Sequence, residues 1–343
     1  MVTEIRYGGM SSYELERCGV LTPTRRKYTV TVHGEYPTYQ GSSVPCDLLA
    51  DNEHKHTPYH FGYRFDFRDP ELHPRDVGSN EVFADVINYP LGQEQALRRQ
   101  LQTADSMRHP AKANIFMMED LWRYVSLPGE TIVDFFGGTG TTGIAVRENR
   151  NVILIELETP FVALSSDNNK KLNDLYGKSF VIIQGDNKKV LLGMKNQIDH
   201  IMGSPPYAGA MTRKAITEDS AESDKQLTGN MMVGEYTASP DNLGISNKFM
   251  YNQRMTRLYQ ASFDALKPGG TMTVILADIT RDGKRVPLSR WLYTTCGRIG
   301  FQLLMHFRRY MPGTSFKAVH KSRGLYVVQD EDIVLWRKPI PGE

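Results

Sequence analysis

Short apolar runs alternate with helix-like stretches from about residue 131 onward, and this alternation constrains the fold more than any other feature of the sequence. The runs are rich in β-branched residues and lack a strict in–out alternation, which is typical of parallel strands covered on both faces. The sequence therefore predicts an α/β fold with a doubly wound, mostly parallel sheet of the Rossmann type. The predicted strands span 131–135, 152–156, 180–183, 198–202, 270–276, 303–310 and 325–336.

Two segments depart from this alternation. Residues 1–105 are rich in Tyr, His, Pro and Asp and hold only brief strand-like runs such as 28–32, so we expect an N-terminal extension with a candidate role in substrate recognition. The remainder, 106–343, is expected to form the main domain. Within it, 208–251 is polar and carries several glycines, and its length predicts either a functional loop or a partly disordered one.

The composition excludes several classes of protein. No apolar run approaches the roughly 20 residues that cross a bilayer, and the N-terminus lacks the pattern of a signal peptide, so we expect an intracellular protein and no membrane partner. Cys18, Cys46 and Cys296 lie too far apart for a disulfide framework or a zinc site. The three histidines within 54–60 complete no recognised ligand pattern either, so no metal site is expected.

Positive charge gathers toward the C-terminus although the net charge is only +2. Between residues 281 and 323, ten Lys and Arg residues stand against the single acid Asp282. Such an excess suits a phosphate backbone, whereas 47–105 leans acidic. A solvated helix face is the alternative for this stretch. The candidate contacts to a nucleic acid are Arg281, Arg285, Arg308, Arg309, Lys321 and Arg323.

A glycine-rich turn, DFFGGTGTTG, follows the first predicted strand at 134–143 and leads into a helix-like stretch. Glycines let the backbone approach a ligand closely, and a helix N-terminus offers N–H groups. Gly138, Gly140 and Gly143 also satisfy the dinucleotide fingerprint, and Glu156 ends the next strand, where a carboxylate can hold ribose hydroxyls. A nicotinamide-dependent oxidoreductase therefore stays open as an interpretation.

Other residues favour a different cofactor. Asp186 and Asn187 end the third predicted strand, where a second carboxylate can receive an adenine amino group. With them, the turn resembles the S-adenosylmethionine site of DNA amino-methyltransferases, whose pattern is Asp-Pro-Phe-x-Gly-Ser-Gly-Thr. Thr139 replaces the serine conservatively, and Phe135 stands where the family has proline. Upstream, His109-Pro110-Ala111-Lys112 resembles the block that closes over the methionine part of the cofactor. The resemblance implies that the cofactor is held by His109, Lys112, Asp134, Phe136, Gly137, Gly138, Gly140, Thr141, Thr142, Glu156, Asp186 and Asn187.

The stretch GSPPY at 203–207 leaves the fourth predicted strand through two prolines. Proline fixes its own backbone and pushes the preceding residue toward an extended conformation, so the segment is rigid. It falls where the same family keeps its catalytic tetrapeptide, which implies catalytic roles for Ser204, Pro205, Pro206 and Tyr207. Serine at the first position is typical of cytosine-N4 enzymes, whereas adenine-N6 enzymes more often carry Asp or Asn. The tetrapeptide follows the glycine turn, which departs from the commonest order in cytosine-N4 enzymes.

The resemblance implies a DNA methyltransferase that uses S-adenosylmethionine on double-stranded DNA, with cytosine N4 preferred over adenine N6. Residues 106–343 would then be the catalytic domain, in a prokaryotic or phage-encoded protein of the cytoplasm that could have a restriction endonuclease partner. The remote alternatives are an RNA methyltransferase, the oxidoreductase, and a DNA-binding protein with a relic pocket. A carbon-5 cytosine enzyme would need a Pro-Cys nucleophile after the glycine turn, and Cys46 precedes it. Oligomeric state and recognition sequence are left open.

Overall fold

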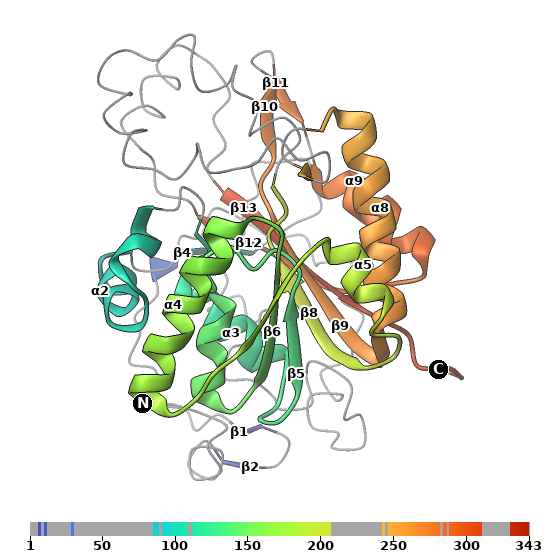
Figure 1. Ribbon diagram of the computed structural model, residues 1–343. Helices are drawn as coiled ribbons and strands as arrows, with labels where there is room; N and C mark the ends of the chain where they lie inside the picture. Colours follow the sequence, from blue (N-terminus) through green and yellow to red (C-terminus); the bar gives the residue numbers. More distant parts are fainter. Residues whose placement is uncertain are drawn as a thin grey trace. The chain divides into compact units, whose positions relative to one another are not determined.

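The chain forms two compact units. One unit comprises residues 92–119 and 128–267 and is called the glycine-loop unit below; the other comprises 1–91, 120–127 and 268–343 and is called the antiparallel unit. The computed structural model (Figure 1) describes residues 6–7, 10–11, 29–30, 85–88, 91–108, 112–206, 242–243, 246–281, 284–286, 288–310 and 330–342.

Four parallel strands form the centre of the glycine-loop unit, in the order β8-β5-β6-β7. They are β5 (Thr131–Asp134), β6 (Asn151–Glu156), β7 (Val181–Gln184) and β8 (Ile198–Gly203). The central side chains of β5, β6 and β8, such as Ile132, Leu154 and Ile201, are fully buried, which explains why these sequences show no strict alternation. β7, expected to be buried like the others, is the last strand in this order and leaves Val181 exposed. The parallel α/β arrangement predicted from the sequence is confirmed.

Helices lie on both sides of these strands (Figure 1), with α4 (Thr159–Tyr176) on one side and α5 (Asn187–Leu192) and α8 (Lys248–Ala265) on the other. Local signals set their ends. Pro160 is the second residue of α4, after the N-cap Glu158, and Gly177 ends the helix in the left-handed conformation. The N-cap side chains of α5 and α8 accept from backbone N–H groups. The remaining helices of this region are α2 (Leu91–Leu101), η2 (Ala104–Arg108), α3 (Ile115–Val125) and η3 (Thr142–Glu148).

The antiparallel unit has the strand order β3-β4-β12-β13-β9. β13 runs antiparallel to both β9 and β12, and β12 runs parallel to β4. The hairpin β10-β11 and the pair β1-β2 complete its strands as described. The bounds are β1 (Arg6–Tyr7), β2 (Met10–Ser11), β3 (Thr29–Val30), β4 (Asp85–Asn88), β9 (Leu266–Leu276), β10 (Ile279–Arg281), β11 (Lys284–Val286), α9 (Leu288–Ile299), β12 (Gln302–Tyr310) and β13 (Asp330–Arg337).

Some sequence expectations need correction. The polar segment expected to run to residue 251 ends earlier, because the Asn247 side chain accepts from the Met250 N–H and starts α8 at Lys248. The glycine turn leads into a short 3-10 helix, η3, which has too few aligned peptide groups to act as a strong helix dipole. The part of the expected loop at 208–241 and the first residues of the strand expected at 325–336 lie outside the described residues.

The predicted boundary between residues 105 and 106 stays a prediction. Helix α2 precedes this boundary and η2 straddles it. Residues 92–108, which include almost all of both helices, lie in the same compact unit as the glycine turn. The hydrogen bonds described below explain why this region packs with that turn.

Candidate active site

Asp134 ends β5 at the edge where the glycine turn begins. Its side chain is buried, and its two oxygens accept hydrogen bonds from the Phe136 N–H (2.9 Å) and the Thr142 hydroxyl. Burial raises the pKa of Asp134 to about 6, and these two hydrogen bonds oppose the shift. The carboxylate thereby ties the beginning of the turn to the start of η3.

The glycine turn itself is held against β6. Gly138 has φ +51°, a conformation that favours glycine, and its N–H donates to Glu156 Oε2 at 2.7 Å. Its carbonyl accepts from the Ser165 hydroxyl at 2.7 Å. A Cβ at Gly138 would meet only the Phe136 carbonyl, at 3.8 Å, so this part of the turn faces open space. Gly137 and Gly140 continue the turn through N–H groups bonded to Ile155 and Gly137 carbonyls.

Glu156 is the second carboxylate of the site. Besides Gly138, the N–H groups of Leu157 and Glu158 donate to its Oε1, at 2.8 and 2.9 Å. Burial raises the pKa of Glu156, the three N–H bonds lower it, and the nearby Glu158 charge raises it further. A carboxylate offers about four acceptor positions, so three donors leave capacity for a ligand hydroxyl.

Asp186 and Asn187 lie where β7 gives way to α5. Asp186 Oδ1 accepts from the Lys189 N–H at 3.0 Å and caps the helix, while no described residue donates to its other oxygen. The Asn187 side-chain amide donates to the Phe135 carbonyl at 2.8 Å. This bond fixes the start of α5 to the residue that follows Asp134.

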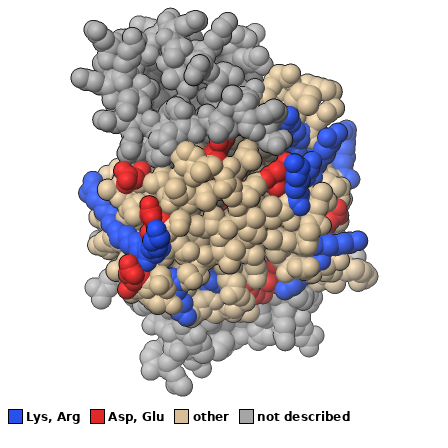
Figure 2. Space-filling view, in the orientation of Figure 1, with Lys and Arg blue, Asp and Glu red and all other residues tan. Residues whose placement is uncertain are grey.

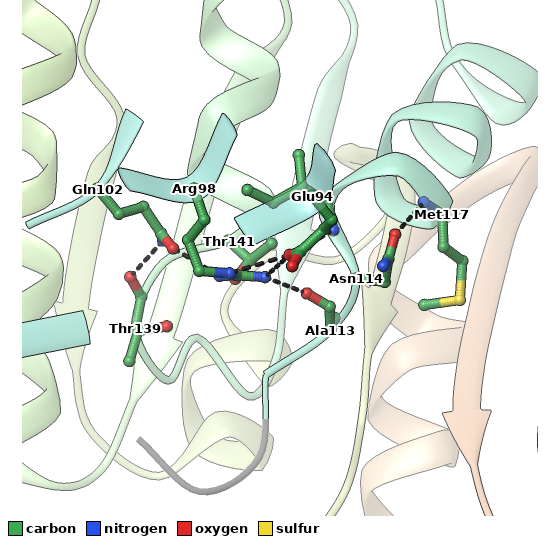
Figure 3. Close-up of polar contacts among 9 residues, drawn as sticks. Glu94, Arg98, Gln102, Ala113, Asn114, Met117, Thr139 and Thr141 are labelled. Carbon is green, nitrogen blue, oxygen red and sulfur yellow. Dashed lines mark hydrogen bonds and ion pairs between the residues drawn. The ribbon is translucent and has the colours of Figure 1, made fainter. Parts of the chain in front are cut away.

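A buried arginine on α2 supports the glycine turn from the other side (Figure 3). Arg98 is 2% exposed and pairs with Glu94 at 2.6 Å. Its guanidinium also donates to Gln102 Oε1, to the Ala113 carbonyl and, at 3.2 Å, to Thr141 Oγ1. Gln102 in turn donates to the Thr139 carbonyl at 3.1 Å. Glu94, Arg98 and Gln102 were missed by the sequence interpretation, although their i, i+4 spacing was visible.

The block expected over the methionine part of the cofactor is described only in part. His109 lies outside the described residues. Lys112 is half-buried, and its pKa is lowered first by burial and then by the Arg98 charge, with the Glu94 charge acting in the opposite direction. Because Arg98 holds the adjacent Ala113 carbonyl, this block and the glycine turn share one anchor.

The start of the tetrapeptide adjoins the glycine turn. The Phe135 N–H donates to the Met202 carbonyl in β8 at 3.2 Å. At Gly203 an added Cβ would stand 3.0 Å from Asp134 Oδ1 and 3.4 Å from the Phe135 ring, so no larger residue fits without displacement. Ser204 is exposed, Pro205 is buried and Pro206 is half-buried, whereas Tyr207 lies outside the described residues.

The predicted nucleic-acid contacts lie in the antiparallel unit. Arg281 and Arg285 belong to the hairpin β10-β11, and Arg308 and Arg309 to β12, while Lys321 and Arg323 lie outside the described residues. Only the Arg309 side chain is described, and its Nε lies 2.7 Å from Glu331 Oε1. The role of this stretch in binding stays a prediction.

The described residues contain no group of three or more His, Cys, Asp or Glu side chains placed to hold a metal ion. None of the described helices has the length and apolar character needed to span a membrane.

Comparison with known proteins finds similarity over part of the chain. The model of a DNA methylase family that acts on N6 and N4 amino groups matches residues 38–167, a range that includes Asp134, the glycine turn and Glu156. A curated relative, the type II methyltransferase M.PvuII of Proteus hauseri, is 37% identical over 78 residues, which cover 20% of the chain and 23% of that protein. The chain thus spans less than a quarter of the length of this methylase.

Solved structures give weaker likenesses. An S-adenosylmethionine-dependent methyltransferase from Methanosarcina mazei is 9% identical, with a TM-score of 0.40 over 63% of this chain and 95% of that one. A Thermus thermophilus protein described as a DNA modification methylase is 20% identical, with a TM-score of 0.27 over 45% and 51% of the two chains. At these values the fold of the chain is assigned from its own strand order.

The hydrogen-bond acceptors of the site fit S-adenosylmethionine, the cofactor that the sequence resemblance implies. Glu156 has acceptor capacity left for ribose hydroxyls, and the second oxygen of Asp186 can accept from an adenine amino group. The open space at Gly138 lets a ligand approach the backbone between them.

Proposed function

We propose that this chain transfers a methyl group from S-adenosylmethionine to an exocyclic amino group of a base in DNA, with cytosine N4 preferred and adenine N6 as the alternative. The observation that carries the proposal is the close packing of Gly203, the residue before the tetrapeptide, on Asp134, since a Cβ added at Gly203 would lie 3.0 Å from Asp134 Oδ1. The tetrapeptide therefore begins next to the glycine turn. Methyl donor and acceptor must meet within a few ångströms, so adjoining sites are a requirement of the reaction.

S-adenosylmethionine, when bound, supplies a methyl group on a positively charged sulfur. The protein's part is to prepare the acceptor, an amine whose lone pair is delocalised into the base. In the proposed site, Ser204 Oγ and the Pro205 carbonyl accept hydrogen bonds from the two amine hydrogens, which favours a nitrogen whose lone pair is available. Tyr207 would stack on the base, which must be turned out of the duplex to react.

The environment of Ser204 and Pro205 supports these roles. Pro205 is buried and its ring fixes the backbone, while Ser204 is exposed and accessible to a base. Serine is too weak a base to remove a proton early, so we expect the amine proton to leave with or after methyl transfer. By the family resemblance, serine at the first position of the tetrapeptide favours cytosine N4 over adenine N6 as the methylated group.

The decisive experiment identifies the product. The purified protein is incubated with labelled S-adenosylmethionine and unmethylated DNA, the DNA is digested to nucleosides, and the labelled nucleoside is identified by mass and retention. The expected product is N4-methyl-2′-deoxycytidine. Label in N6-methyladenine would move the assignment to the alternative, and label in carbon-5 methylcytosine would overturn it.

Parallel reactions separate the remaining alternatives. RNA of matching sequence tests the RNA methyltransferase hypothesis, and calorimetry with NAD tests the oxidoreductase hypothesis, which uses the same glycines and Glu156 but gives the tetrapeptide no role. A restriction endonuclease partner and a prokaryotic or phage setting stay predictions from the sequence.

A further inference from the structure

Two neighbouring helices of the glycine-loop unit present a positively charged surface. α5 and α8 pack against each other on one side of the parallel strands (Figure 1). Lys188 and Lys189 lie in the first turn of α5, and Lys248 and Arg257 lie on α8; Lys188 is half-buried and the other three are exposed. These four residues are called the α5/α8 basic face. In Figure 2, Lys and Arg side chains are visible on the right, where Figure 1 draws these helices, as well as on the left, and some Asp and Glu side chains lie on both sides.

The two helices themselves carry little acidic charge. α5 contains no acid, and the single acid of α8, Asp264, lies in its last turn and accepts from Gln260. Asp186 precedes α5 and caps it through the Lys189 N–H. Within the described ranges, no carboxylate lies within ion-pair distance of the four cations. A solvated helix face usually mixes both signs, so a face of one sign favours a polyanionic partner.

The face reaches the edge of the sheet where the reaction is proposed. α5 begins directly beyond β7, and Asn187 joins its start to Phe135, next to Asp134. The last residue of α8 is held beside the beginning of β8, since the Gln197 N–H donates to the Ala265 carbonyl at 2.9 Å. An 18-residue helix is about 27 Å long. Lys248 at its other end therefore lies toward the strand end that carries Ser204.

An exposed aromatic side chain accompanies the cations. Phe249 is 68% exposed and Met250 is 37% exposed, both in the first turn of α8 beside Lys248. Large apolar side chains are normally covered, and aromatic rings among cations are a combination that holds nucleic acid. In such a complex the cations would contact the phosphates, and Phe249 would contact a base or a sugar.

We propose that the α5/α8 basic face binds the phosphate backbone of DNA beside the target base. The proposal rests on the proposed function for its partner, and it assigns the contact to the glycine-loop unit rather than to the stretch 281–323. Loss of phosphate contacts weakens binding and makes it less dependent on salt, because fewer counterions are released.

The test uses two variants of the full chain with the same change of charge. In the first, Lys189, Lys248 and Arg257 are each changed to Gln; in the control, Arg99, Lys170 and Lys178 are each changed to Gln. The control residues are also exposed, one Arg and two Lys, but lie on or beside α2 and α4. Glutamine keeps helix propensity, and thermal unfolding confirms that both variants fold.

Binding of a short labelled duplex of mixed sequence is measured by fluorescence anisotropy between about 50 and 200 mM salt. The face variant should lower the slope of log affinity against log salt by about 2 to 3, at about 0.9 per lost contact, and the control should keep the wild-type slope. Equal slopes for the two variants, or a wild-type protein that does not bind the duplex, would overturn the inference.

Methyl transfer is measured separately on the same proteins. If the wild type methylates DNA but the face variant binds DNA like the control, the proposed function is kept and only the proposed role of the α5/α8 basic face is refuted. Conversely, a wild type that binds the duplex through this face but forms no methylated nucleoside contradicts the proposed function alone.

Discussion

At the scale of single residues, the Asp134 carboxylate ties the start of the glycine turn to η3. Burial raises its pKa from an ordinary 3.8 to about 6, so the native state keeps the proton at pH values where the unfolded chain has released it. The contribution of Asp134 to the free energy of unfolding is therefore largest below about pH 3 and declines as the pH rises through 6, by about 3 kcal/mol in all. Asp134→Asn removes this titration. The stability of the variant relative to wild type should rise by most of that amount, about 2 kcal/mol, from pH 4 to pH 7, as measured by urea unfolding.

Other carboxylates titrate alike in both proteins and cancel in this difference. A difference that stays constant across the pH range would mean that Asp134 titrates at its ordinary pKa in the folded protein.

Ser204 separates chemistry from binding. Ser204→Ala removes one proposed acceptor for the amine and leaves Glu156 and Asp186, the carboxylates proposed to bind the cofactor, so turnover should fall roughly ten- to a thousandfold while cofactor affinity stays nearly constant. Tyr207→Ala should also weaken capture of DNA, since a stacking contact is worth about 1–3 kcal/mol per base, and Tyr207→Phe should be milder. Single-turnover rates and calorimetry measure the two effects. Full turnover in both alanine variants would show that the tetrapeptide is only a turn.

At the scale of elements, α2 is fastened to the glycine turn by the buried pair of Glu94 and Arg98. Arg98→Met leaves the Glu94 charge buried without its partner, and removal of one partner of a buried pair costs about 3–5 kcal/mol of stability. Adding Glu94→Gln removes that charge while keeping an acceptor for the Ile115 N–H, so the double variant should be more stable than Arg98→Met alone. Urea unfolding measures the stabilities. A double variant less stable than the single one would contradict this account.

The loss of the Arg98 contacts should also weaken cofactor binding. Because Arg98 also holds Thr141 and the Ala113 carbonyl, the double variant should bind S-adenosylmethionine more weakly than wild type, with turnover at saturating cofactor less affected. Arg98→Lys should not restore binding fully, since a single ammonium cannot reproduce the fork of the guanidinium.

At the scale of the whole molecule, cofactor binding should appear as added stability. A ligand that binds only the folded state stabilises it by about 2.7 kcal/mol at a hundredfold excess over its Kd. S-adenosylmethionine should therefore raise the unfolding temperature of the wild type, and NAD at the same concentration should not. Glu156→Gln should reduce the increase, because the amide offers one acceptor oxygen where Gly138, Leu157 and Glu158 already donate. Thermal unfolding with and without ligand measures this, and a larger increase with NAD would reverse the cofactor assignment.

The sequence by itself determined the parallel strands and the glycine turn, because both depend on local signals. Apolar runs specify β5, β6 and β8, a short β-branched run specifies the more exposed β7, and the glycine spacing with Glu156 specifies the turn. Tertiary structure alone decided which distant residues hold that turn. Arg98 and Thr141 are 43 residues apart, and the hydrogen bond from the Phe135 N–H to the Met202 carbonyl joins the turn to β8. Such contacts arise from the packing of elements that are far apart in the chain, so no periodicity or spacing in the sequence reports them.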